Sequence, residues 1–401
     1  MSLYKNKQFK SLFGIGIFTN IGDSFFFIVS MWYITKITEN PVYTGLVVFL
    51  FTLPETLLLF FGPLIDRFDL KNILFISTIT QISVHLCLIT LLLTNSLSIY
   101  VLCILLLFSA LSSAIIYPIE ETMLPQVVAK QDIIKANSWY TVAYKMTNSI
   151  FDGLAGILLA VGTVSGMYSI NLLVFLVPLI LIRHLPKKTK KLDYHFSLKE
   201  YVVNLKDGIQ FVFQSNIKHM VLPLTFLNFF TAMNIVCLPY FAKALTNNPT
   251  AYGLILSISG IGSMIGSIMV NKIETYFPVG KILTFGLIFN GIFWMLAILS
   301  PTPILVYLFV FLTNFCMGVY NVIFAALFQV MTPKHLLGRV NTCVDSLITF
   351  AMPIGSLAGG GILAILSTTQ LMLINACALL MTGVFYFFDQ KIYRLVKMKD
   401  I

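Results

Sequence analysis

Long apolar runs separated by short polar breaks constrain this 401-residue chain more than any other feature. A helix needs about 20 apolar residues to cross a bilayer, and runs of this length fill most of the chain. Only 10% of the residues are charged, against roughly 25% in soluble proteins. We therefore predict an all-α membrane protein with twelve transmembrane helices, at residues 11–37, 43–64, 72–94, 97–118, 134–163, 165–184, 218–245, 251–271, 280–299, 303–331, 338–366 and 368–388.

The positive charges are distributed unevenly between the two ends of the predicted helices. Of 26 Lys and Arg residues, Lys36, Lys145 and Lys243 lie within or at the ends of helices, and the other 23 fall in loops on one side. Cytoplasmic loops of membrane proteins are enriched in Lys and Arg. We therefore predict a multi-pass protein of the cytoplasmic membrane with both termini in the cytoplasm, and we assign the net charge of +10 to this asymmetry, not to nucleic-acid binding.

The second half of the chain repeats the first. The stretch ITENPVYTG from Ile37 recurs as LTNNPTAYG from Leu245, an offset of 208 residues. Shorter matches follow at similar offsets: Ala136-Asn137-Ser138 with Val340-Asn341-Thr342, and Leu154-Ala155-Gly156 with Leu357-Ala358-Gly359. The repeat predicts two six-helix bundles at 1–184 and 218–401.

A basic segment at 185–217 separates these two halves. Eight Lys and Arg residues fall between Arg183 and Lys218, counting both ends. Ser197 with Glu200 has the spacing of a capping box, and an apolar stripe follows it. This pattern predicts a cytoplasmic linker with an amphipathic helix at the inner membrane surface.

The stretch from Gly62 to Leu74, GPLIDRFDLKNIL, breaks the apolar sequence between the second and third predicted helices. It resembles the loop between helices 2 and 3 of the major facilitator superfamily, although Asp69 stands where that family usually has Gly and Leu70 where it usually has Arg. The resemblance implies a conformational latch in which Asp66 meets the N-terminal end of helix 11, where the helix dipole favours a carboxylate. The predicted latch residues are Gly62, Asp66, Arg67, Lys71 and Arg339.

A second stretch, from Ala326 to Gly360, is similar to the helix 10–11 region of the macrolide-efflux-like branch of that superfamily. The matching residues are Gln329, Pro333, Leu337-Gly338-Arg339-Val340 and Met352-Pro353-Ile354-Gly355. The resemblance implies the major facilitator fold, with a substrate site between the two halves. It also implies export of drugs or siderophores in exchange for protons.

Two positions depart from the pattern of the drug antiporters. The usual Arg of helix 4 is absent, and Ser109 occupies its approximate place. The usual Gly-Pro of helix 5 is replaced by Phe151-Asp152. Proton coupling therefore has to use other residues than those typical of the family.

Ionisable side chains inside the predicted helices are the candidates for proton coupling, because each costs roughly 2.5–3.5 kcal/mol at a helix centre and needs a partner or a role. Asp23 is the first choice, because it lies near the midplane on a polar stripe with Asn20 and Phe27. A structural ion pair of Lys145, with Asp23 as partner, is an equal alternative. The full set is Asp23, Glu55, Lys145, Asp152 and Asp345. We interpret His85 as a packed neutral histidine, and Glu120 and Glu121 as solvated acids.

Uncharged polar and aromatic residues predict a cavity for an amphipathic organic molecule. Family resemblance places helices 1, 4, 7 and 10 around that cavity. The candidates on these helices are Asn20, Phe27, Ser109, Ser112, Asn228, Thr231, Asn314 and Asn321.

Together these patterns predict a secondary transporter that exports amphipathic organic compounds, such as macrolides or other drugs, with protons as the coupling ion. A siderophore or lysophospholipid carrier is an alternative, and a non-transporting receptor with the same fold is a weaker one. The sequence has no nucleophile elbow, phosphate loop or metal-ligand cluster, so we predict no enzyme activity, cofactor or metal. We expect a monomer in the lipid bilayer whose partners are its small-molecule substrate and protons.

Overall fold

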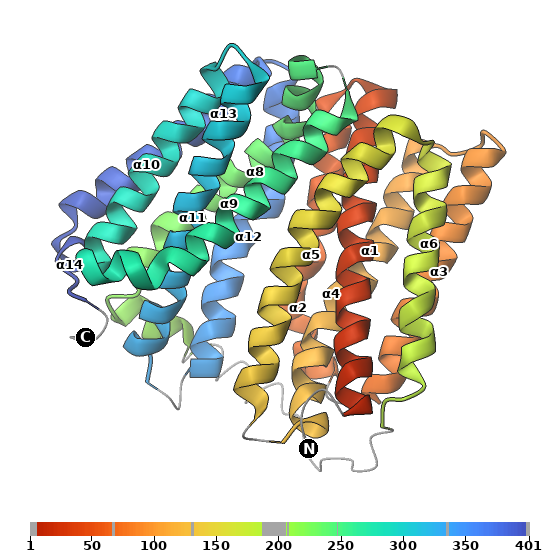
Figure 1. Ribbon diagram of the computed structural model, residues 1–401, viewed down its shortest axis with the longest axis horizontal. Coiled ribbons are helices and arrows are strands. Elements are labelled where there is room, and N and C mark those ends of the chain that lie inside the picture. The colour runs from red at the N-terminus through yellow and green to blue at the C-terminus, as the bar shows by residue number, and fades with distance from the viewer. Residues whose placement is uncertain are drawn as a thin grey trace. The chain divides into compact units, whose positions relative to one another are not determined.

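The computed structural model describes residues 6–65, 69–129, 132–186, 206, 208–246, 248–333 and 337–397, and its regular elements are helices (Figure 1). Twelve helices in this part have 19 residues or more: α1 (Lys7–Thr38), α2 (Pro41–Ile65), α3 (Leu70–Leu93), α4 (Ile99–Val127), α5 (Ile133–Val161), α6 (Val164–Ile182), α8 (Lys218–Thr246), α9 (Pro249–Tyr276), α10 (Val279–Leu299), α11 (Pro303–Met331), α12 (Leu337–Leu363) and α13 (Thr368–Phe388). The short α14 (Gln390–Tyr393) follows α13. The predicted all-α class is confirmed, and each predicted span overlaps one long helix.

The repeated Asn-Pro turns are equivalent helix starts. Pro41 is the first residue of α2, and Pro249 is the first residue of α9. Proline suits this position because its φ is already helical and its missing N–H would have no partner there. The side-chain oxygens of Asn40 and Asn248 each accept a hydrogen bond from the backbone N–H two residues later, at 3.0 and 2.9 Å. The repeat in the sequence is therefore also a repeat of helix caps.

Ten of the twelve long helices in the described part are long and apolar enough to cross a membrane. Of the other two, α2 contains the shorter apolar stretch Pro41–Leu57, and α5 carries Lys145 and Asp152. The protein is therefore a multi-pass membrane protein.

The chain forms two compact units. The first comprises Met1–Ile37 with Leu50–Phe196, and the second comprises Thr38–Phe49 with Ser197–Ile401. The first turns of α2 therefore pack with the second unit, where the Thr44 hydroxyl hydrogen-bonds with that of Tyr240 at 2.9 Å. Most of the predicted linker lies outside the described residues. Within its described part, residues 208–214 are helical. The predicted domain boundaries and the amphipathic linker helix stay predictions.

In the first unit, apolar side chains from α1, α3, α4, α5 and α6 form one buried core. Its members include Phe9, Leu12, Leu74, Ile119 and Tyr140. The ring of Tyr140 on α5 also packs edge-on against Phe13 of α1, with centroids 5.0 Å apart. This core holds the first half of α1 against α4 and α5, and these helices carry the polar groups of the candidate site.

In the second unit, small residues let two pairs of helices approach closely. Gly262 and Gly266 of α9 face the backbone of α11, and Gly355 and Gly359 of α12 face α8. In both pairs the glycines are four residues apart and therefore lie on one face of the helix. This spacing is common in membrane proteins because van der Waals packing, and not the removal of apolar surface from water, drives helix association there.

Three consecutive glycines of α12 have three different surroundings. A Cβ atom on Gly359 would lie 2.7 Å from the Cα of Met233 on α8, and one on Gly360 would lie 3.1 Å from the Cα of Gly45 in α2. A Cβ atom on Gly361 would have no neighbour within 4 Å. The contacts of α12 therefore require the first two glycines but not the third.

We expect Gly359→Ala to lower the free energy of unfolding by about 1–3 kcal/mol, because the added methyl group overpacks the contact with α8. The control is Gly361→Ala on the same helix, which is expected to preserve stability, since alanine favours a helix over glycine by about 1 kcal/mol. Both effects are measured by unfolding the two purified variants in detergent through titration with SDS. Equal stability of the two variants would contradict this account of the α8–α12 contact.

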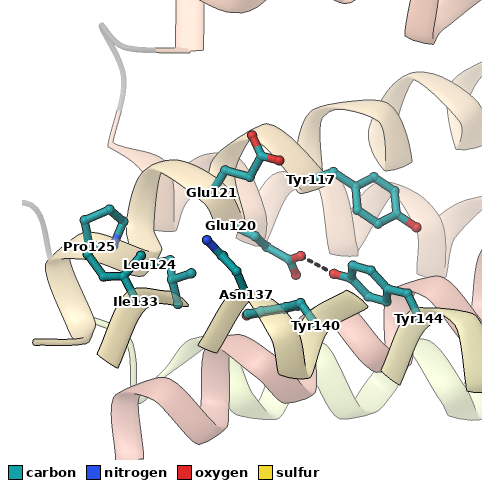
Figure 2. Close-up of a pocket in the computed structure, with 9 residues that line it drawn as sticks. All are labelled: Tyr117, Glu120, Glu121, Leu124, Pro125, Ile133, Asn137, Tyr140 and Tyr144. Carbon is teal, nitrogen blue, oxygen red and sulfur yellow. Dashed lines mark hydrogen bonds between the residues drawn. The ribbon is translucent and has the colours of Figure 1, made fainter. Parts of the chain in front are cut away.

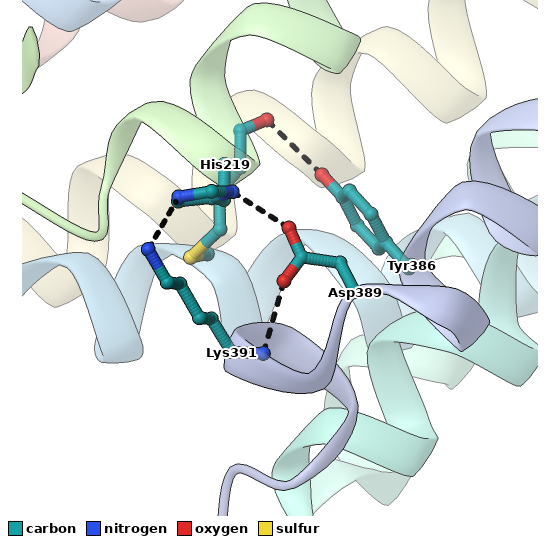
Figure 3. Close-up of polar contacts among 5 residues, drawn as sticks. His219, Tyr386, Asp389 and Lys391 are labelled. Atoms are coloured by element: carbon teal, nitrogen blue, oxygen red, sulfur yellow. Dashed lines mark hydrogen bonds and ion pairs between the residues drawn. The ribbon is translucent and has the colours of Figure 1, made fainter.

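At one end of the second unit, His219 connects the start of α8 to the end of α13 (Figure 3). Its Nδ1 lies 2.6 Å from Oδ2 of Asp389, and the Nζ of Lys391 lies 3.3 Å from its Nε2. Because an ammonium group only donates, Nε2 accepts and Nδ1 donates to Asp389. Tyr386 adds a hydrogen bond to the carbonyl of Met220 at 3.0 Å. These contacts join α13 and α14 to α8.

Candidate functional site

Asp23 lies in the middle of α1 and is partly buried. Both of its carboxyl oxygens accept hydrogen bonds from α4: Ser113 Oγ donates to Oδ1 at 2.5 Å, and the Tyr117 hydroxyl donates to Oδ2 at 3.4 Å. The two donors are four residues apart, so they lie on one face of α4. An acid inside a membrane needs such partners, because burial away from water disfavours its charge.

A chain of hydrogen bonds leads from α3 to this acid. Ser109 Oγ donates to Gln81 Oε1 at 2.6 Å, and Gln81 Nε2 donates to Ser113 Oγ at 2.5 Å. Ser113 donates in turn to Asp23. All three hydrogen bonds run in the same direction, so the carboxyl group of Asp23 is the final acceptor of the chain.

Asn20 and Phe27, predicted on the same stripe of α1 as Asp23, have different neighbours. Asn20 Nδ2 donates to the Tyr117 hydroxyl at 3.3 Å, so a second chain of donors also ends on Asp23. The ring of Phe27 packs edge-on against that of Phe51, with centroids 5.0 Å apart. Asn20 therefore belongs to the hydrogen-bond network of Asp23, and Phe27 belongs to the apolar packing beside it.

Gln81 is a member of the site that no sequence pattern singled out. Its side chain is fully buried, and its Nε2 also donates to the carbonyl of Ser109 at 3.1 Å. The signal in the sequence was weak but present: Gln81 is an amide inside an otherwise apolar span, where side-chain amides commonly bond to a neighbouring helix.

His85 is buried beside the same network. Its Nδ1 lies 2.8 Å from the carbonyl of Gln81, and its Nε2 lies 2.8 Å from Nδ2 of Asn171, which also donates to the carbonyl of Gly22 at 3.0 Å. A carbonyl only accepts and an amide nitrogen only donates, so the proton is on Nδ1 and the ring is neutral. His85 is thus a packed neutral histidine, as predicted, and it connects α3 and α6 to α1 next to Asp23.

The described hydrogen bonds to Asp23 come from Ser113 and Tyr117, and not from the other predicted proton-coupling residues. The side chains of Glu55 on α2 and Asp345 on α12 are exposed. Lys145 and Asp152 are on α5, and their side chains lie outside the described part of the structure. The pairing of Lys145 with Asp23 therefore stays a prediction.

Four of the eight predicted cavity side chains bond to backbone carbonyls. Ser112, Thr231 and Asn314 each donate to the carbonyl four residues earlier, at 2.8, 3.1 and 2.9 Å. This is a common way to satisfy a polar side chain within a helix. Asn228 donates to a carbonyl of α12 at 3.0 Å, and Asn321 is exposed. Their role as substrate contacts stays a prediction.

The prediction that Glu120 is solvated is wrong, because its side chain is only 4% exposed. The span predicted at 97–118 ends too early: α4 continues to Val127, so Glu120 lies two turns inside it. The Tyr144 hydroxyl donates to Glu120 Oε2 (Figure 2). Both side chains lie against Gly16 of α1, where a Cβ atom would collide with them.

A cavity of about 450 Å³ adjoins this pair, between the last turns of α4 and the first turns of α5 (Figure 2). The residues that line it are Tyr117, Glu120, Glu121, Leu124, Pro125, Ile133, Asn137, Tyr140 and Tyr144. Tyr117 is thus shared between the cavity and the hydrogen-bond network of Asp23.

The predicted latch is described only in part. Lys71 Nζ donates to the carbonyls of Arg183 and Leu185 at 3.1 and 2.7 Å, which lie just beyond the end of α6. A cation is favourable there because the last carbonyls of a helix carry partial negative charge. The backbones of Gly62 and Arg339 lie in α2 and α12, whereas Asp66 and Arg67 lie outside the described residues. The latch therefore stays a prediction.

The sequence is similar to known membrane transporters. The model of a family described as transmembrane secretion effector matches residues 1–400. The MFS-type transporter YfiS of Bacillus subtilis (strain 168) is 24% identical over 380 residues, which cover 89% of this chain and 87% of YfiS. The multidrug efflux pump Tap of Mycolicibacterium fortuitum is 24% identical over 249 residues, 60% of each chain.

Solved structures of transporters share the fold. A bacterial homologue of the human lysosomal transporter Spinster aligns with a TM-score of 0.73 at 12% identity, over 98% of both chains. The nucleoside transporter NupG aligns with a TM-score of 0.71 at 12% identity, over 96% of this chain and 98% of NupG. A bacterial homologue of the iron transporter ferroportin has the same TM-score at 16% identity, over 96% and 99%. At these identities the likeness establishes the fold alone, and it confirms the fold predicted from the sequence.

Proposed function

Because the chain belongs to the transmembrane secretion effector family of the major facilitator superfamily, we propose that it exports amphipathic organic compounds in exchange for protons. It is a membrane transporter of the MFS type and not an enzyme. The similarity to a multidrug efflux pump supports the direction of transport and the class of substrate. The proposal includes location in the cytoplasmic membrane with both termini in the cytoplasm, in keeping with the distribution of Lys and Arg.

Two chains of hydrogen bonds end on Asp23, and this convergence is the observation that supports proton coupling. As a carboxylate, Asp23 accepts hydrogen bonds from Ser113 and Tyr117. Once protonated, its carboxylic acid also has a proton to donate, and the Tyr117 hydroxyl is the neighbour that can accept it. Tyr117 then needs an acceptor for its own proton. The carbonyl oxygen of Asn20, which is buried without a partner among the described residues, becomes that acceptor when the amide turns over.

Proton uptake by Asp23 would therefore reverse the chain that runs through Tyr117 and Asn20, and leave the chain through Ser113 unchanged. Asp23, Ser113 and Gln81 belong to three different helices, so this change alters the contacts of α1 with α4. We propose that this group of residues couples proton binding to the change of conformation.

Transport by the wild-type protein tests the proposal. Inverted vesicles that contain the full chain are given an imposed pH gradient and a panel of fluorescent drugs, macrolides, siderophores and lysophospholipids. We expect uptake of an amphipathic drug or macrolide that requires the gradient and is lost when a protonophore collapses it. Uptake of siderophores or lysophospholipids alone would favour the alternative carriers, and the absence of any gradient-dependent uptake would contradict proton coupling.

A further inference from the structure

The cavity beside Glu120 has a chemically distinctive lining. Three tyrosine rings form one continuous wall: the centroids of Tyr117 and Tyr144 are 5.7 Å apart, and those of Tyr140 and Tyr144 are 5.6 Å apart. Two carboxyl groups, Glu120 and Glu121, line the same cavity, and none of the lining residues that the structure describes is Lys or Arg. Figure 2 shows these side chains around one space. The lining thus combines aromatic faces with two carboxyl groups.

Glu120 is the unusual member of this lining. It is almost completely buried, its Oε2 accepts from Tyr144, and its Oε1 has no hydrogen-bond partner among the described residues. A buried carboxyl group with a vacant acceptor is costly unless a cation or a donor joins it. The described lining residues include no cation, so a bound molecule is a natural source of one.

We propose that this cavity binds an amphipathic organic cation, with Glu120 as its counter-charge and the rings of Tyr117, Tyr140 and Tyr144 as its aromatic faces. Aromatic faces attract organic cations within about 6 Å of the ring centroid, most strongly where water is excluded. The volume of about 450 Å³ falls within the range of roughly 300–1,000 Å³ that is typical of small-molecule sites. This inference rests on the proposed function, because it names the substrate class that the transporter carries.

Tyr117 connects this cavity to the proton-coupling group. Its ring lines the cavity, and its hydroxyl donates to Asp23. A cation that packs against the ring of Tyr117 therefore also acts on the hydrogen bond to Asp23. We assign Tyr117 as a positioning residue between the substrate and the acid.

Equilibrium dialysis of the purified full-length protein tests the site without any pH gradient. The probe is tetraphenylphosphonium, a permanent organic cation, and triphenylphosphine oxide serves as a neutral comparison of similar chemistry. We expect the cation to bind and the neutral compound to bind much more weakly. Glu120→Gln should weaken binding of the cation at least about 30-fold, because it removes the buried counter-charge.

Two further variants make the result specific to the buried acid. Glu39→Gln is the matched control, since Glu39 is an exposed acid that is not among the residues lining the cavity, and it should weaken binding by less than about fivefold. Asn137→Lys places a positive charge on an exposed residue of the lining. It should weaken binding of the cation at least about tenfold and leave the neutral compound unaffected. Asn137→Lys therefore tests the site even where Glu120→Gln fails to fold.

Equal affinity for the cationic and neutral compounds would overturn the inference, as would unchanged binding of the cation in Glu120→Gln or Asn137→Lys. Failure of the proposed function has a different signature: the cation binds and depends on Glu120, yet vesicles show no gradient-driven uptake. Conversely, gradient-driven uptake of neutral compounds by a protein that does not bind the cation would remove this site and leave the proposed function in place.

Discussion

Asp23→Asn is expected to reduce pH-driven transport to the level of vesicles that lack the protein. Asparagine has nearly the shape of aspartic acid and keeps a polar group facing Ser113 and Tyr117. It cannot gain or lose a proton in the physiological range, so the hydrogen bonds around it no longer change with pH. The variant should still fold and enter the membrane, because the change removes an intramembrane charge and does not add one.

The measurement is uptake of a transported amphipath into inverted vesicles under an imposed pH gradient, with the amount of protein checked by immunoblot. Glu39→Gln is the control for removal of an acid. Glu39 is an exposed residue whose ion pair with Lys243 spans 3.2 Å, and exposed ion pairs contribute little. Wild-type transport in Asp23→Asn would transfer the coupling role to Glu55, Asp152 or Asp345, and Asp152 would be tested next.

Gln81→Leu is expected to have the largest effect on stability. Leucine has a similar size but cannot replace the three hydrogen bonds that Gln81 makes with Ser109 and Ser113 on α4. Hydrogen bonds between helices in membranes contribute roughly 0.6–1.7 kcal/mol each, so three of them predict a loss of about 2–5 kcal/mol. Transport should also slow, because Ser113 loses the donor that keeps its own proton directed at Asp23.

Unfolding by SDS titration measures this loss, and Gln126→Leu is the matched control. Gln126 is exposed on α4 and makes one hydrogen bond, to the carbonyl four residues earlier at 3.1 Å. The control should change stability by no more than about 0.5 kcal/mol. Similar losses in the two variants would mean that the hydrogen bonds of Gln81 between α3 and α4 contribute nothing specific.

The transmembrane helices could be predicted from the sequence because their cause is local. About 20 apolar residues in a row have to form a helix in a bilayer, since every backbone group then finds its partner within the same segment. The starts of α2 and α9 were equally predictable, because Asn40 and Asn248 cap their helices through contacts only two residues away. The end of α4 was misplaced because Glu120 reads as the end of an apolar run, whereas the helix continues.

The site was predictable only in part. Asp23 was identified as a charge inside an apolar span, which needs no knowledge of its neighbours. Its partners were not identified, since Ser113 lies 90 residues away along the chain and Gln81 reaches it through a different helix. The burial of Glu120 was missed for the same reason, because it depends on Gly16 of α1 and Tyr144 of α5.

The sequence by itself determined the all-α class, the places of the twelve long helices, the repeat of the Asn-Pro turns and the family. The tertiary structure alone decided which face of each helix meets another helix. In a soluble protein, apolar periodicity marks that face, but in a bilayer both the lipid-facing side and the buried side of a helix are apolar. The rotation of α3 that brings Gln81 to Ser113, and that of α4 that brings Tyr117 to both Asp23 and the cavity, are therefore set by side-chain packing and hydrogen bonds between helices.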